Sequence, residues 1–91
     1  MKAKHKDLIN QVLATLSMDS DVLSSRDIAE SVSQLQEVLD DLLYFYQDGD
    51  QTVACIENCI YYLEEMQNLD SDDEDYQINL GVVVYELNKL L

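Results

Sequence analysis

Hydrophobic residues recur along residues 28–46 at alternating steps of four and three, which is the spacing of one face of an amphipathic helix. The apolar positions are Ile28, Val32, Leu35, Leu39, Leu42 and Tyr46. Acidic residues and a tyrosine occupy the opposite face, where Arg26 is the one basic residue. We therefore predict a helix over about residues 24–46, with Ser24 and Asp27 forming a capping box at its start.

Two other segments have the same helical periodicity. The first covers about residues 4–16, with apolar positions Leu8, Ile9, Val12, Leu13 and Leu16. The second covers about residues 51–69 and carries two apolar stripes, one formed by Val53, Ile56, Ile60 and Leu63 and the other by Cys55, Cys59, Tyr62, Met66 and Leu69. At 100° per residue the two stripes point about 110° apart. A helix with two apolar faces contacts two neighbours, so we expect this helix to be central.

The last segment, about residues 74–90, fits two kinds of secondary structure. Tyr76, Leu80, Val83, Leu87 and Leu90 have helical spacing, and Ser71 with Glu74 matches a capping box. Gly81 and three consecutive valines favour a strand instead. We predict a helix, because a single strand would have no partner elsewhere in the chain.

These elements predict an all-α fold, a small antiparallel bundle of about four helices in one domain over residues 1–91. The chain contains no proline, which suits long helices, and its hydrophobic share of 47% is ordinary for a folded protein.

The charge balance is unusual. Nineteen acidic residues and five basic ones give a formal net charge of −14. Lys2, Lys4 and Lys6 lie at the start of the chain, so the rest is more acidic still. Direct binding to nucleic acid is disfavoured because the phosphates would be repelled. A basic protein partner, by contrast, would complement this surface.

Tyr44 and Tyr61, two tyrosines predicted to be exposed among carboxylates, are candidates for contact with such a partner. An aromatic ring supplies buried area, and the surrounding acids pair with arginine and lysine. Together with the acidic run after residue 70, the predicted partner-binding residues are Glu37, Asp40, Asp41, Tyr44, Asp48, Glu57, Tyr61, Glu64, Glu65, Asp72, Asp73 and Asp75.

A second candidate surface lies opposite the core stripe of the last helix. Ile78, Val82 and Tyr85 share that side. Either this helix is packed on both sides, or it exposes an apolar strip that serves a partner or self-association.

Other chemistry has little support in the sequence. The acidic run fails the calcium-loop pattern, because Asp75 and Gly81 stand where glycine and glutamate are required. Cys55 and Cys59 are expected in the core rather than at a metal, and His5 is expected in solvent. We expect no cofactor, no metal and no enzymatic activity. With no signal peptide or long apolar span, we expect a cytoplasmic protein.

The leading functional hypothesis is a stoichiometric inhibitor or decoy that covers the basic nucleic-acid-binding surface of an enzyme, most naturally a nuclease. In charge and length the chain resembles bacteriocin immunity proteins, phage anti-CRISPR proteins and anti-restriction DNA mimics. Its acidic loop leading into a C-terminal helix resembles helical immunity proteins of the colicin D type. The alternative is a helical homodimeric adaptor whose acidity serves only solubility.

Overall fold

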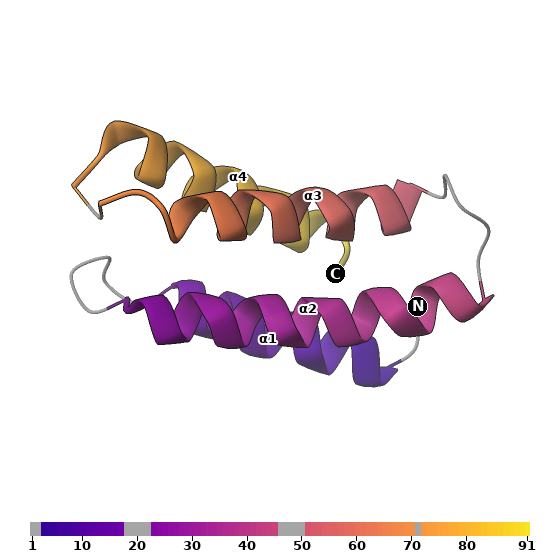
Figure 1. Ribbon diagram of the computed structural model, residues 1–91. Coiled ribbons are helices and arrows are strands. Elements are labelled where there is room, and N and C mark those ends of the chain that lie inside the picture. Colours follow the sequence, from indigo (N-terminus) through magenta and orange to yellow (C-terminus); the bar gives the residue numbers. More distant parts are fainter. Residues whose placement is uncertain (1–2, 18–22, 46–50, 71) are drawn as a thin grey trace.

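The computed structural model describes residues 3–17, 23–45, 51–70 and 72–91. Within these residues the chain forms four helices and no strand: α1 (Ala3–Leu16), α2 (Ser25–Phe45), α3 (Gln51–Met66) and α4 (Glu74–Lys89). Successive helices run in opposite directions, with α1 and α2 in one layer and α3 and α4 in the other (Figure 1). The predicted all-α antiparallel bundle is therefore confirmed, and the strand alternative for the last segment is wrong.

Each helix packs against two others, which closes the bundle. The contacts of α3 with α2 and with α4 are the most extensive, while α1 packs along α2 and less extensively against α4. The two apolar stripes of α3 explain this position, because Ile56 on one stripe and Cys59 on the other are both fully buried. The resulting body measures 38 × 22 × 20 Å.

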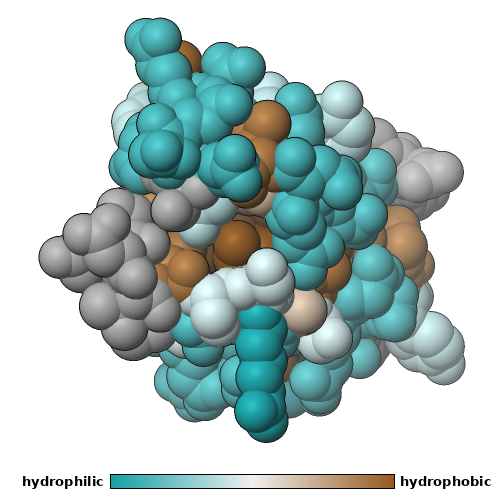
Figure 2. Space-filling model, turned by 60° about the vertical axis from the view of Figure 1, so that its left-hand side comes forward, coloured by the Kyte–Doolittle hydropathy of each residue, from teal (hydrophilic) through white to brown (hydrophobic). Residues whose placement is uncertain are grey.

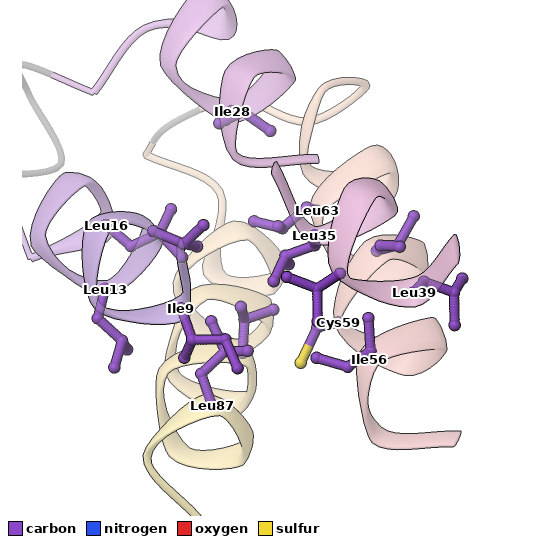
Figure 3. Packing of buried hydrophobic residues seen from close by; sticks show 14 of the residues in the cluster. Ile9, Leu13, Leu16, Ile28, Leu35, Leu39, Ile56, Cys59, Leu63 and Leu87 are labelled. Carbon is purple, nitrogen blue, oxygen red and sulfur yellow. The ribbon is translucent and has the colours of Figure 1, made fainter. Parts of the chain in front are cut away.

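The core draws on all four helices. Ile9 from α1, Leu35 from α2, Cys59 from α3 and Leu87 from α4 converge in the interior (Figure 3) and are inaccessible to solvent. Val38 is also fully buried, so the apolar face of α2 is wider than the heptad-like spacing alone indicates. Tyr46, the last predicted position of that face, lies outside the described residues.

Side-chain caps fix where two of the helices begin. At the start of α2, the Asp27 amide donates to Ser24 Oγ at 3.2 Å and the Ser24 amide donates to Asp27 Oδ2 at 3.0 Å, which is the predicted capping box. At the start of α4 the cap is Asp73, whose carboxylate accepts from the Asp75 amide at 2.9 Å. Asp73 thus takes the role that the sequence assigned to Ser71, which lies outside the described residues.

Helix α3 ends at Met66, three residues earlier than predicted. The amides of Gln67, Asn68 and Leu69 donate to carbonyls three residues back instead of four. This tighter turn satisfies the last carbonyls of the helix and redirects the chain toward α4.

Three polar side chains of the described residues are buried in this bundle, namely His5, Ser31 and Asn79, and the Ser31 hydroxyl donates to the Asp27 carbonyl at 3.0 Å. The expectation that His5 lies in solvent is wrong, since only 1% of it is exposed. His5 stands one helical turn before Ile9, so it extends the apolar stripe of α1 and is carried into the interface with α2.

Candidate functional site

The carboxylates of the described residues lie on the outside of the bundle, and none of them is buried. In the same part of the chain, only Asp41 and Glu86 come within 4 Å of a basic nitrogen. The other described acids therefore have no ion-pair partner among the described residues, and the helices present a largely unneutralised anionic surface.

The first patch of predicted partner-binding residues lies on the carboxyl-terminal half of α2. Glu37, Asp40 and Tyr44 are exposed there, and Tyr44 is 85% accessible. Gln36 donates to Asp40 at 3.0 Å, which leaves the charge of that carboxylate in place. Asp48, predicted to belong to this patch, lies outside the described residues.

Asp41 differs from its neighbours because α1 neutralises it. Lys4 Nζ lies 2.9 Å from Asp41 Oδ2, and His5 Nε2 lies 3.1 Å from the same oxygen. The hydrogen bond from Lys4, followed by the one from His5, lowers the pKa of Asp41, and the same contact raises the pKa of Lys4. Asp41 thus ties α1 to α2 and contributes less negative charge to the surface than the sequence suggests.

The second patch lies on the carboxyl-terminal half of α3. Tyr61 is 65% exposed, and its ring packs edge-on against Tyr62 with centroids 5.6 Å apart, which helps to hold it upright. Tyr61, Glu64 and Glu65 line one shallow hollow of about 390 Å³, together with Gln67 and Asn68. This hollow brings three predicted partner-binding residues together, with an aromatic wall beside two carboxylates.

The two patches occupy different levels of the bundle. The end of α2 and the start of α3 lie at the same end of the molecule (Figure 1). Tyr61 is ten residues beyond Gln51, which places it about 15 Å farther along the long axis than the start of α3. Glu57 lies between the two levels and is exposed. The predicted residues therefore form an extended surface rather than one pocket.

The opposite end of the bundle carries the acidic run. Asp72, Asp73 and Asp75 are all exposed there, although Asp73 also caps α4. Seen from this end, hydrophobic side chains are visible in a hollow between polar flanks (Figure 2). A hollow of about 290 Å³ at the junction of α2, α3 and α4 is lined by Leu23, Ile28, Met66, Leu69, Asp70 and Tyr76, among others. The sequence predicted Ile28, Met66, Leu69 and Tyr76 on apolar stripes, made no prediction for Leu23, and did not indicate that these residues border a hollow.

The two cysteines are free and lie between α3 and α4. Cys55 is half-buried, and its thiol lies 3.3 Å from Glu86 Oε2. Burial, reinforced by this hydrogen bond, raises the pKa of Cys55 to about 11, and burial also raises the pKa of Cys59. Both thiols are therefore protonated near neutral pH, which is unfavourable for nucleophilic or metal-binding chemistry. No cluster of three or more His, Cys, Asp or Glu side chains suited to a metal ion occurs among the described residues.

Comparison with protein-family models, curated proteins and solved structures finds no match for this chain. Among the helices as described, none combines the length and apolar character needed to cross a bilayer. Any functional argument therefore depends on the surface itself.

Proposed function

We propose that the chain is a stoichiometric inhibitor or decoy that covers the basic nucleic-acid-binding surface of a cytoplasmic enzyme, as immunity proteins, anti-CRISPR proteins and anti-restriction DNA mimics do. The observation that supports this most strongly is the exposed, uncompensated set of carboxylates on α2, α3 and the residues before α4. Packing of the helices does not require carboxylates on their outer sides. A concentration of like charge instead destabilises the compact state through self-repulsion.

The dimensions of the molecule suit such a role. Its long axis of 38 Å corresponds to roughly 11 base pairs of duplex at 3.4 Å each, which carry about 22 phosphate charges. The chain carries a formal net charge of −14 over the same length. The charge per unit length is therefore of the same order as that of the ligand it would replace.

Carboxylates and tyrosines contribute differently to such a complex. Charge complementarity steers the encounter and raises the association rate, but it adds little to the lifetime of the complex when the pairs lie at the rim. Tyr61 can supply the apolar contact area that slows dissociation, and Glu64 and Glu65 flank it to pair with arginine or lysine. We therefore place the centre of the contact at the Tyr61 hollow and treat the α2 patch as steering charge.

Variants of the hollow test this proposal. The immobilised chain is first used to isolate its partner from the cells that carry it. The purified partner is then titrated with each variant while its nucleic-acid binding and its enzymatic activity are measured. Tyr61→Ala is expected to raise the dissociation rate, with a loss of at least about tenfold in affinity if the ring is an interface anchor. Glu64→Gln with Glu65→Gln is expected to lower the association rate and to reduce its dependence on salt.

Matched substitutions elsewhere control for general effects of charge and aromatic area. Glu30→Gln removes one exposed carboxylate of α2 outside the predicted partner-binding set, and Tyr85→Ala removes an exposed ring on α4. Both variants should inhibit like the wild-type chain. If the hollow variants inhibit as well as these controls, or if the partner does not bind nucleic acid, the proposal is wrong.

A further inference from the structure

The outward side of α4 is unusually apolar for a helix in so acidic a chain. Ile78 is 54% exposed and Tyr85 is 64% exposed, with the half-buried Val82 between them. At 3.6 residues per turn, these three positions share an arc of about 100° with Glu74, Gly81 and Lys89. We call these six residues the α4 strip. The sequence left open whether this side is packed or exposed, and in one copy of the chain Ile78 and Tyr85 are exposed.

Gly81 lies in the middle of the strip and has no explanation within one copy of the chain. A Cβ atom at this position would meet nothing within 4 Å. Glycine in an exposed helix interior costs about 1 kcal/mol relative to alanine. A missing side chain on a helix surface leaves room for close approach of another helix, and Gly81 provides such a gap in the strip.

The order of residues in the strip indicates which helix fits this gap. The point midway between Gly81 and Val82 is equidistant from Ile78 and Tyr85, and also from Glu74 and Lys89. An antiparallel contact of two α4 helices about this point would set Val82 over the gap at the partner copy's Gly81. It would also set Ile78 against Tyr85, and the acidic Glu74 against the basic Lys89.

We propose that two copies of the chain associate through α4, antiparallel and about a two-fold axis that passes between Gly81 and Val82. Every member of the strip then has a complementary partner in the other copy. The Val82 side chain fills the space at Gly81, the aliphatic Ile78 packs on the aromatic Tyr85, and the Glu74 carboxylate faces the Lys89 ammonium. Such self-complementarity is the requirement of a two-fold symmetric interface, in which the same patch serves both subunits. In one copy the Lys89 Nζ lies 5.1 Å from the Tyr85 ring centroid and 3.4 Å from Glu86 Oε2, so its contact with Glu74 of the second copy would be made beside the existing pair with Glu86.

The dimer is expected to be weak and to respond to salt in a particular direction. One helical strip buries less than the roughly 800 Å² per partner of a standard interface. Each copy also carries a formal charge of −14, so bringing two together is opposed by long-range repulsion. Salt screens that repulsion, and self-association should therefore strengthen as the salt concentration rises.

Two single-charge variants test the antiparallel register. Glu74→Lys alone and Lys89→Glu alone each place like charges opposite one another twice per dimer, so each should dimerise roughly tenfold more weakly than wild type. An equimolar mixture of the two variants restores opposite charges at both contacts. The mixture should associate like wild type, as measured by sedimentation equilibrium from about 10 μM to about 1 mM. Circular dichroism establishes that each variant is folded.

Matched controls carry the same charge changes on α2, namely Glu30→Lys and Arg26→Glu, and they should not weaken the dimer. Glu74→Lys is informative against its control because it lowers the net negative charge and yet is expected to weaken association. Gly81→Gln tests the gap separately: glutamine is a good helix former, so the variant should melt higher while dimerising at least about tenfold more weakly.

Three results would overturn the proposed dimer. They are a wild-type chain that stays monomeric at 1 mM in high salt, a mixture that associates no better than its components, and a Gly81→Gln variant that dimerises like wild type. The decoy proposal is tested separately, because partner binding should weaken with salt while self-association should strengthen.

Discussion

Asn79 is the polar residue of α4 whose side chain points into the core. Its side-chain nitrogen Nδ2 is buried without a hydrogen-bond partner. We expect Asn79→Leu to stabilise the fold. Leucine is similar in size, and it removes the donor that the folded chain leaves unsatisfied. The neighbouring core residues Val83 and Leu87 on the same side of α4 are fully buried, so the new side chain enters an apolar environment.

The magnitude follows from the cost of the unpaired donor. A buried polar group without a partner costs about 1–3 kcal/mol, and a shape change in a packed core offsets part of any gain. We expect a net increase of about 1–2 kcal/mol in the free energy of unfolding. For a domain of 60–100 residues, each kcal/mol raises the melting temperature by about 4–8 °C, so the variant should melt roughly 5–15 °C higher.

Urea and thermal unfolding followed by circular dichroism measure this difference. Asn58→Leu on the exposed side of α3 is the matched control, because it makes the same chemical change where the amide is already solvated. The control should melt within a few degrees of wild type. An Asn79→Leu variant that melts lower than wild type would refute the reasoning and show that the amide contributes a contact that leucine cannot replace.

Three further predictions concern other contacts of the fold. Asp41→Asn should destabilise the chain at neutral pH, and the difference from wild type should vanish as the pH falls below the ordinary aspartate value of 3.8, because the folded pKa of Asp41 is lower and its stabilisation is lost on protonation. A difference that does not shrink as the pH falls below 3.8 would contradict the role of the carboxylate charge. Ser24→Ala should cost about 1 kcal/mol in urea unfolding, whereas Ser25→Ala should cost much less, because only Ser24 caps α2. Cys55 should react with a thiol reagent at pH 8 at least roughly a hundredfold more slowly in the native chain than in urea, since its pKa is raised to about 11. Equal rates would show that the thiol is not held protonated.

The helices could be predicted from the sequence because a 3.6-residue period decides which side of each element is buried. The two stripes of α3 are the clearest example, since they predicted that this helix contacts two neighbours. The sequence of the last segment fits a helix or a strand, because Gly81 and the run of valines have low helix propensity. Packing of Tyr76, Val83 and Leu87 against the rest of the bundle is sufficient to make it helical.

Polar residues on the buried faces could not be placed from periodicity alone. His5 and Asn79 both stand at helical spacing from apolar core residues. A polar side chain at such a position is equally consistent with the edge of the solvent-exposed face. The pairing of Lys4 and His5 with Asp41 joins residues that are 36 or 37 positions apart, so it depends on how α1 lies on α2. No local pattern encodes that register.

The candidate surface was predicted as a set of residues but not as a shape. Exposure of the carboxylates and of Tyr61 follows from the same periodicity that buries Ile60 and Leu63. The hollow beside Tyr61 depends on the tight turn after Met66, which brings Gln67 and Asn68 around the two glutamates. This turn is determined by hydrogen bonding at the end of the helix, which the spacing of hydrophobic residues does not predict.

The central claim is that the exposed carboxylates of this chain take the place of nucleic-acid phosphates on a basic enzyme. The most direct measurement is competition: labelled nucleic acid is bound to the isolated partner, and its release is followed by fluorescence anisotropy as the chain is added at several salt concentrations. We predict complete release at one chain per binding site, with an affinity that falls steadily as salt rises. A ternary complex that retains the nucleic acid at saturation, or an affinity that does not change with salt, would contradict the claim.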